Sequence, residues 1–102
     1  MTQFSLSSEQ LIKEVRSVFD VQSAALSKNS KNLGNEYLSA LELMKGCTGR
    51  VIVCGMGKSG HIGRKISATL ASLGTPSFFM HPGEAFHGDL GMVTPEDLLL
   101  LI

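Results

Sequence analysis

The first third of the chain carries a repeating pattern of apolar and polar residues that predicts a helix. One stripe with a period near 3.6 runs through Leu11, Val15, Val18, Gln22 and Ala25, supported by Phe19 and Leu26. Ser7 or Ser8 can cap this helix, and Gln10 completes a capping box with Ser7. The polar, turn-prone stretch 28–32 predicts that the helix ends near Ser27.

A second helix is predicted before the first strand. Tyr37, Leu38, Leu41 and Met44 repeat at helical spacing. Gly46 follows them and is expected to end the helix in a left-handed conformation.

A strand–helix–strand unit is predicted next. Residues 51–54 form a short β-branched run next to glycine, which is typical of a strand buried on both faces. The helix that follows is marked by Ile62, Ile66, Leu70 and Leu73, and is stopped by Gly74 and Pro76. Residues 77–80 form the second strand. Such a right-handed βαβ unit begins a parallel sheet, so the predicted class is α/β.

The last apolar run, 98–102, predicts a third strand. An all-apolar strand with no helix after it would leave a sheet face and a strand edge uncovered, which proteins in water avoid. The sequence therefore predicts the amino-terminal part of a longer domain. Helices are expected in residues 1–46, and the first part of the sheet domain in residues 47–102.

Composition excludes several classes of function. Nine Lys and Arg balance nine Asp and Glu, so no basic field is available for nucleic acid or an anionic membrane. The longest apolar run is far shorter than the roughly 20 residues of a spanning helix, and no signal pattern opens the chain, so a cytoplasmic protein is expected.

Cys47 and Cys54 match no zinc spacing and are expected as reduced thiols. A domain this small buries limited surface, which favours self-association.

The turn Gly-Met-Gly-Lys-Ser-Gly at 55–60 concentrates the candidate chemistry. Glycine exposes bare N–H groups, and a strand-to-helix turn aims them at an anion, for which phosphate is the obvious candidate. Lys58 opposes the helix dipole there, which an anionic ligand would explain. A solvated surface lysine is the alternative. Ser59 could contact the ligand or cap the helix.

Two familiar phosphate motifs fit this turn poorly. A P-loop requires glycine where Ile52 stands. The dinucleotide fingerprint matches at Gly55, Gly57 and Gly60, but the second strand lacks the acidic residue that anchors ribose, and Glu84 lies too far into the next loop. Nucleotide binding therefore stays as a secondary alternative.

A second group of polar residues follows the second strand, at the same expected edge of the sheet. Its members are His81, Glu84, His87 and Asp89. Imidazoles suit proton transfer near neutral pH, but the spacing of the two histidines matches no standard metal site. The alternative is a turn whose polar side chains bond their own backbone. His61 is expected to be structural or to lie at a subunit contact.

The sequences GMGKSGHIGRK at 55–65 and HPGEAFHGDLGM at 81–92 closely resemble the sugar isomerase (SIS) domain of bacterial arabinose 5-phosphate isomerases. The resemblance implies a flavodoxin-like parallel sheet in a three-layer α/β/α arrangement, here cut after the third strand. It also implies interconversion of D-ribulose 5-phosphate and D-arabinose 5-phosphate, an aldose–ketose isomerisation. The product would supply 3-deoxy-D-manno-octulosonate for lipopolysaccharide or capsule in a Gram-negative cytoplasm.

The same resemblance implies site residues. Lys58 matches the family's catalytically important lysine, His87 a substrate-contacting histidine, and His81 a histidine associated with inhibitory zinc. Substrate contacts are implied for Gly57, Ser59, Gly60, Gly74, Thr75 and His87, although the strand order places Gly74 and Thr75 at the opposite strand end. No cofactor is required by the resemblance, and a homotetramer with sites between subunits is implied.

The family's serine-rich phosphate loop, its acidic residues and a later histidine would follow residue 102. We therefore expect these 102 residues alone not to turn over sugar phosphate. A sugar-phosphate-binding regulatory SIS module without catalysis is the alternative function.

Overall fold

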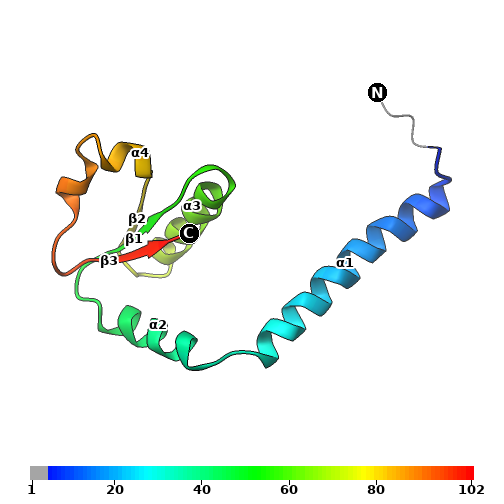
Figure 1. Cartoon of the computed structure of the whole chain (residues 1–102), viewed down its shortest axis with the longest axis horizontal. Coiled ribbons are helices and arrows are strands. Elements are labelled where there is room, and N and C mark those ends of the chain that lie inside the picture. The colour runs from blue at the N-terminus through cyan, green and yellow to red at the C-terminus, as the bar shows by residue number, and fades with distance from the viewer. Residues whose placement is uncertain (1–4) are drawn as a thin grey trace. The chain divides into compact units, whose positions relative to one another are not determined.

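The computed structural model describes residues 5–102 (Figure 1). Contacts divide the chain into two units, the first ending at Tyr37 and the second running from Leu38 to Ile102, and each is described by itself. None of the helices within the described residues has both the length and the apolar character that crossing a bilayer requires.

The first unit consists mainly of helix α1, Ser8–Lys31. The Ser7 hydroxyl accepts a hydrogen bond from the Gln10 amide, and the Gln10 side chain accepts one from the Ser7 amide, so the expected capping box is confirmed. The expected end near Ser27 is wrong, because the helix continues through the polar residues to Lys31. Polar residues are tolerated on an exposed helix, and the last turn is basic, which complements the helix dipole.

Helix α2, Asn35–Gly46, confirms the second predicted helix. The expectation for Gly46 is wrong, because the glycines with positive φ are Gly57, Gly74 and Gly88. Gly46 is instead the last helical residue, and the amide of Cys47 continues the turn by donating to the carbonyl of Met44 at 3.3 Å.

Three parallel strands form the sheet of the second unit, in the order β2–β1–β3. Strand β1 is Val51–Cys54, β2 is Ser77–Met80 and β3 is Leu98–Leu101. The three strands run in register, with Val51 opposite both Ser77 and Leu98. All of β1 is buried, as expected for a central strand. The predicted α/β class and parallel sheet are confirmed.

Helix α3, Gly57–Ser72, crosses from β1 to β2 and packs on one face of these two strands. Its buried residues are all small: Gly60, Gly63 and Ser67. A Cβ at Gly63 would meet carbons of both Phe79 and Val53 at 3.1 Å. Glycine therefore sets how closely the helix approaches the sheet.

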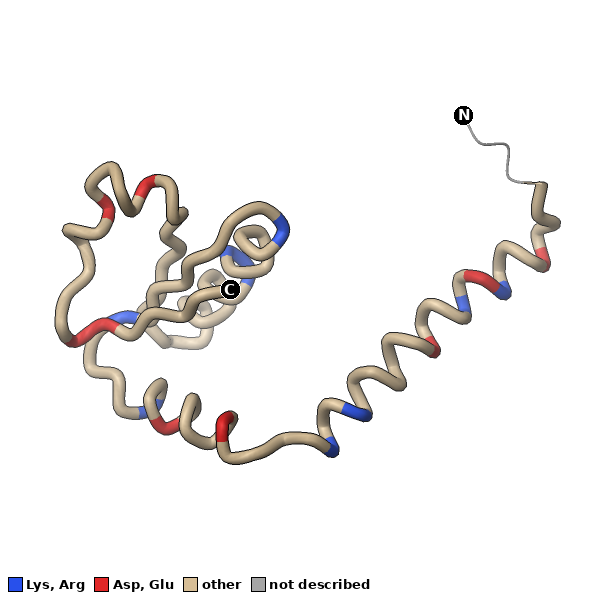
Figure 2. Tube along the Cα trace, viewed as in Figure 1, with Lys and Arg blue, Asp and Glu red and all other residues tan. Residues whose placement is uncertain are grey.

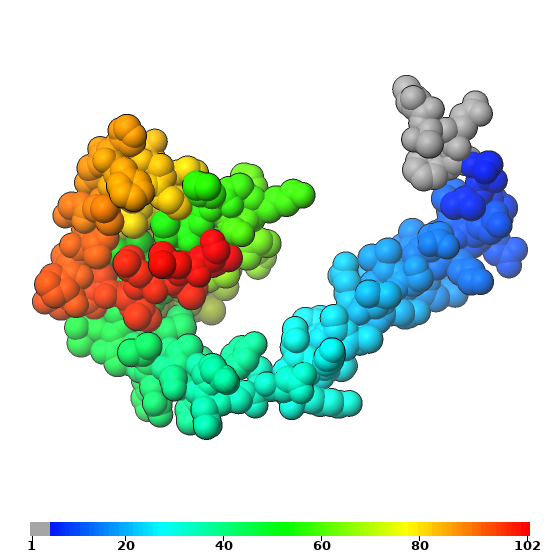
Figure 3. All heavy atoms as spheres, in the orientation of Figure 1, coloured from blue at the N-terminus to red at the C-terminus, as the bar shows by residue number. Residues whose placement is uncertain are grey.

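The opposite face of the sheet is covered by the segment between β2 and β3. This segment contains the short helix α4, Pro82–Ala85, and the 3₁₀ turn η1, Asp89–Met92. The core on this face is made of Ile52, Cys54, Met80 and Ala85, with Phe78 and Val93 packed against it. The space-filling view shows these segments of the second unit, coloured green to red, in close contact (Figure 3).

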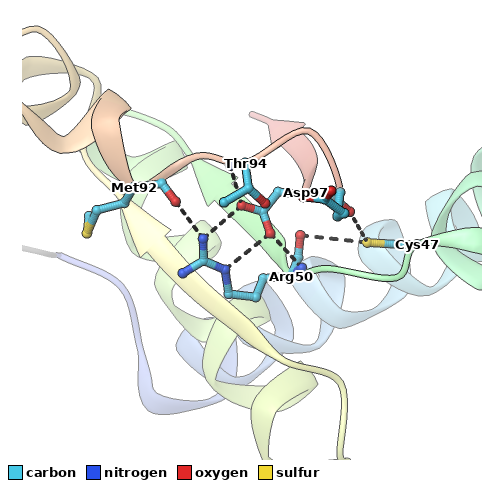
Figure 4. A network of polar contacts seen from close by, with 6 residues as sticks. Cys47, Arg50, Met92, Thr94 and Asp97 are labelled. Carbon is cyan, nitrogen blue, oxygen red and sulfur yellow. Dashed lines mark hydrogen bonds and ion pairs between the residues drawn. The ribbon is translucent and has the colours of Figure 1, made fainter.

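An ion pair ties the starts of β1 and β3 together (Figure 4). The Arg50 guanidinium lies 2.8 Å from Asp97 Oδ2, and Asp97 also accepts hydrogen bonds from the Arg50 and Thr94 amides. Arg50 donates to the Met92 carbonyl as well. The Asp97 side chain is 1% exposed. The Arg50 side chain and the Thr94 amide together hold the pKa of Asp97 well below its usual range.

Candidate functional site

The turn between β1 and α3 needs glycine for two separate reasons. Gly57 has φ of +58°, a left-handed conformation that side chains disfavour. Gly60 has no such constraint, but a Cβ there would lie 2.7 Å from the Gly55 carbonyl oxygen. The chain therefore doubles back on itself at van der Waals distance, and α3 starts directly at the carboxyl edge of the sheet.

The start of α3 is left without a side-chain cap. Met56 occupies the N-cap position and makes no capping hydrogen bond, and no acidic residue lies in the first turn. The amides of the first turn and the positive end of a 16-residue helix therefore face the carboxyl edge of the sheet. The alternative that Ser59 caps the helix is wrong, since Ser59 lies inside the first turn, where it is half-buried. This geometry suits an anion.

Lys58 adds a cation at the same place. Its side chain is exposed. Among the described residues it takes part in no ion pair, whereas Arg50 and Asp97 satisfy each other. The structure thus leaves the Lys58 ammonium available to a ligand or to solvent.

A pocket of about 210 Å³ opens beside this turn, between α3 and the end of β2. It is lined by Gly57, Gly60, His61, Arg64, Phe79 and His81. Arg64 stacks over the Phe79 ring, with its guanidinium carbon 4.2 Å from the ring centroid. This contact restrains a long side chain at the pocket wall while its N–H groups stay free in the guanidinium plane. The lining includes no carboxylate, so the pocket also suits an anion.

His81 has a fixed role in this wall. It caps α4, because its Nδ1 accepts a hydrogen bond of 2.9 Å from the Gly83 amide. In the neutral ring an accepting Nδ1 places the proton on Nε2. His81 therefore offers an Nε2–H donor, and its backbone hydrogen bond matches the alternative that the polar residues of this loop bond their own turn.

The other polar residues of this loop are not brought into the pocket lining. Glu84 lies in α4, His87 is exposed after it, and Asp89 begins η1. Within residues 5–102, no three His, Cys, Asp or Glu side chains gather into a possible metal site. His81 Nδ1 is already used by Gly83, so a zinc ion on His81 would have to change that hydrogen bond and take other ligands. The described donor set by itself does not fit zinc.

Gly74 and Thr75 lie at the opposite edge of the sheet. They end α3 in a Schellman motif, with the Thr75 amide donating to Leu70 and the Gly74 amide donating to Ala71. They precede β2, whose first residue pairs with the first residue of β1. A site formed within one chain at the carboxyl edge cannot include them, and the φ of +94° at Gly74 explains that glycine structurally.

Three pocket residues were not identified from the sequence as ligand-binding residues: His61, Arg64 and Phe79. His61 and Arg64 follow Gly57 and Gly60 at steps of three and four residues, which place all four on one face of a helix. This spacing is a signal that the sequence alone contains. The place of Phe79 depends on strand register and on the close approach of α3, which no local pattern reveals.

Comparison with known proteins identifies the family. The model of the SIS domain matches residues 46–102, which is more than half of the chain. The chain belongs to the SIS domain family. The matched segment contains the whole sheet, the turn at 55–60 and the pocket.

Individual SIS proteins extend the comparison. The arabinose 5-phosphate isomerase KpsF of Escherichia coli O6:H1 is 64% identical over 93 residues, covering 90% of this chain and 28% of KpsF. A structure from E. coli CFT073 in complex with arabinose 5-phosphate has a TM-score of 0.87 at 38% identity, covering 94% of this chain and 51% of that one. A Bacteroides fragilis structure, described as a candidate phosphosugar isomerase involved in capsule formation, has a TM-score of 0.80 at 36% identity, covering 89% and 48%.

The chain thus spans about a quarter of the length of KpsF and about half of the solved SIS structures. The resemblance seen in the two sequence motifs and the SIS fold are confirmed. The roles assigned to single residues in the SIS site stay predictions.

Proposed function

We propose that the carboxyl edge of this SIS domain binds a pentose 5-phosphate, and that the protein interconverts D-arabinose 5-phosphate and D-ribulose 5-phosphate. The observation that carries the proposal is the uncapped start of α3 with Lys58, next to a pocket that has cationic and N–H donor groups and no carboxylate. The name of KpsF and the ligand in the E. coli CFT073 structure support the choice of sugar.

The phosphate group is assigned to the start of α3. A phosphate carries two negative charges near neutral pH and accepts several hydrogen bonds. The amides of Gly57, Lys58 and Ser59 are the first three of α3 and lack helical partners, so they can donate to it. Lys58 then serves either this phosphate or the sugar oxygens beside it.

The reaction moves a proton between neighbouring carbons. A base removes the proton from C2 of the open-chain aldose while the carbonyl oxygen on C1 gains a proton, which gives an enediol. C1 then receives a proton while the hydroxyl on C2 loses its proton and becomes the carbonyl. Negative charge develops on the oxygens on the way, and Lys58 and the Nε2–H of His81 are the described groups that can stabilise it. The base itself is not assigned to a described residue.

Finer features are part of the same proposal. The product would enter octulosonate synthesis for lipopolysaccharide or capsule, and the capsule-formation role given for the Bacteroides protein supports the second of these. A homotetramer and inhibition by zinc rest only on the family resemblance, whereas a cytoplasmic location rests on that resemblance and on the sequence expectation given above.

The decisive experiment transplants the site into a complete enzyme. We would replace the matching 93 residues of KpsF with the corresponding residues of this chain and assay arabinose 5-phosphate turnover. Turnover is expected, and Lys58→Ala should lower kcat by about 100-fold or more, the size of losing one group that stabilises developing charge. Lys65→Ala is the matched control, since Lys65 is exposed on the same helix outside the pocket lining and should change kcat by less than about two-fold.

Two outcomes would contradict the proposal. If the chimera folds and binds arabinose 5-phosphate without turning it over, the regulatory SIS module becomes the better description. If Lys58→Ala and Lys65→Ala behave alike, Lys58 is a solvated surface lysine. The 102 residues alone are expected to show no turnover, and activity from them would overturn that expectation.

A further inference from the structure

Two arginines of the second unit stack on neighbouring phenylalanines of β2, and they differ in their hydrogen bonding. Arg50 lies over Phe78, with its guanidinium carbon 4.9 Å from the ring centroid, and its N–H groups donate to Asp97. Arg64 lies over Phe79 at 4.2 Å, and within residues 5–102 it takes part in no ion pair. Guanidinium N–H groups lie in the plane of the group, so a ring that covers its face leaves them free. Arg64 is therefore held in place while its donors stay available.

The Phe79 ring is fixed in turn by the bare side of α3. A Cβ at Gly63 would lie 3.1 Å from Phe79 Cε2, and a Cβ at Gly60 would lie 3.5 Å from Phe79 Cζ. The ring thus fits against the helix where side chains are missing, and it is half-buried there. This contact fixes the plane of the ring, and with it the position of the Arg64 guanidinium on its face.

Arg64 reaches back toward the start of α3. It follows Gly60 by about one helical turn and Gly57 by about two, and all three residues line the same pocket. Side chains of a helix lean toward its amino terminus. The ring beneath Arg64 touches α3 at Gly60, one turn before Arg64 itself, which agrees with that direction. The guanidinium therefore lies on the side of the pocket that faces the free amides of the first turn.

The charges of α3 leave Arg64 without an internal partner. The basic residues of this helix are Lys58, Arg64 and Lys65, and it contains no acidic residue (Figure 2). The pocket lining adds two histidines and no carboxylate. A fixed cation in such a pocket is suited to an anionic group of a ligand.

We propose that Phe79 is a positioning residue, which holds the Arg64 guanidinium where it binds the phosphate of the ligand together with the free amides of α3. This inference rests on the proposed function, since it takes the pocket as part of the sugar-phosphate site. Phe79 acts through Arg64, because a restrained guanidinium loses less conformational freedom on binding than a mobile one. Arg64 in turn selects phosphorylated sugars, since a neutral sugar offers it no charge to pair with.

A double-mutant cycle tests whether Phe79 acts through Arg64. The full chain is titrated with inorganic phosphate and with D-arabinose 5-phosphate, and amide NMR shifts give the affinities. Arg64→Ala should weaken both by about ten-fold, the size of losing one charge-assisted contact. Phe79→Leu should weaken both by about three-fold, the size of losing an exposed cation–π contact. The double variant should bind like Arg64→Ala alone, because the ring has no effect without the guanidinium.

Phe78→Leu is the matched control. Phe78 is the preceding residue of β2, and it packs against the core on the other face of the sheet under Arg50. Phe78→Leu therefore removes an equal ring without releasing Arg64, and it should change either affinity by less than about two-fold.

The position of Arg64 is also measured without a ligand. A side chain that lies on a ring face has its proton NMR signals shifted upfield. The side-chain protons of Arg64 should show this shift in the wild type and in Phe78→Leu, and should lose it in Phe79→Leu. Arg64 protons at ordinary shifts in the wild type would overturn the proposal.

The binding results separate this proposal from the proposed function. If inorganic phosphate follows the expected pattern and D-arabinose 5-phosphate does not bind, the role of Phe79 stands and the proposed function fails. If D-arabinose 5-phosphate binds and Arg64→Ala leaves its affinity unchanged, the role of Phe79 fails alone. Losses that add in the double variant, or no binding of either probe, also overturn the proposal.

Arg64→Ala keeps the test decisive if Phe79→Leu does not fold. Arg64 is exposed, so its truncation spares the core. An unchanged phosphate affinity of Arg64→Ala then overturns the proposal, whereas a ten-fold loss together with upfield-shifted Arg64 protons in the wild type supports it.

Discussion

Replacing Gly60 with alanine should push α3 away from the sheet edge and disturb the candidate phosphate turn. The added Cβ would lie 2.7 Å from the Gly55 carbonyl oxygen and 3.3 Å from the Gly55 carbonyl carbon. Both are main-chain atoms, so no side chain can rotate away. The ring of Phe79, at 3.5 Å, closes the other side.

Two opposing terms set the size of the effect. Alanine favours a helix interior over glycine by about 1 kcal/mol. Overpacking against rigid neighbours costs up to about 3 kcal/mol, and contact with main chain belongs at the upper end of that range. The net loss for the second unit is therefore about 2 kcal/mol, or roughly 30-fold in the equilibrium for opening.

Hydrogen exchange of the β1 amides is the appropriate assay, because helical circular dichroism would also include the 24 residues of α1 in the other unit. Gly60→Ala should speed exchange at Ile52 and Val53 by about 30-fold. Gly46→Ala is the control, since a Cβ there meets nothing within 4 Å and its φ is not positive. It should leave exchange unchanged or slower. If β1 exchanges equally in Gly60→Ala and wild type, the close approach of α3 to the turn is not what holds this edge.

Two further predictions concern charge. Asp97→Asn should reduce the free energy of unfolding at neutral pH, measured by urea and the methyl NMR signals of β1. The folded pKa of Asp97 is depressed, so the contribution of Asp97 to stability is full above its ordinary pKa of about 4 and is lost as the pH falls below that value. The difference in unfolding free energy between Asp97→Asn and wild type should therefore shrink at low pH. A difference independent of pH would contradict this assignment. Arg64→Ala should weaken arabinose 5-phosphate binding by about ten-fold, which is the size of losing one charge-assisted contact, whereas Lys65→Ala should leave binding unchanged. Calorimetry on the KpsF chimera measures both affinities. Equal affinities of the two variants would remove Arg64 from the site.

The elements of the sheet were predictable because their signals are local. The β-branched run of β1, the glycine and proline that stop α3, and the capping box of α1 each act over a few residues. The segment after β2 was expected as a loop, yet it contains α4, whose start at Pro82 after the capping His81 is a recognisable helix signal. The end of α1 was misplaced because exposed polar residues continue a helix without any packing contact to mark them.

The site was predictable only in part, for a physical reason. Lys58 and the glycine turn lie within six residues of sequence, so their juxtaposition follows from local geometry. The pocket beside them requires Arg64 to reach Phe79, which depends on a parallel register and on Gly63 bringing α3 onto the sheet. Gly74 and Thr75 end α3 at the opposite edge of the sheet, so the fold explains their residue types without a ligand, and the substrate contacts that the resemblance implies for them stay predictions.

The central claim is that the start of α3 binds the phosphate of a sugar phosphate. The most direct test is an amide NMR titration of this chain with D-arabinose 5-phosphate, with D-arabinose as the control. We predict that the sugar phosphate shifts the amides of residues 57–60, that free arabinose does not, and that Lys58→Ala weakens the response. Shifts confined to Gly74 and Thr75, or equal shifts with both sugars, would contradict the claim.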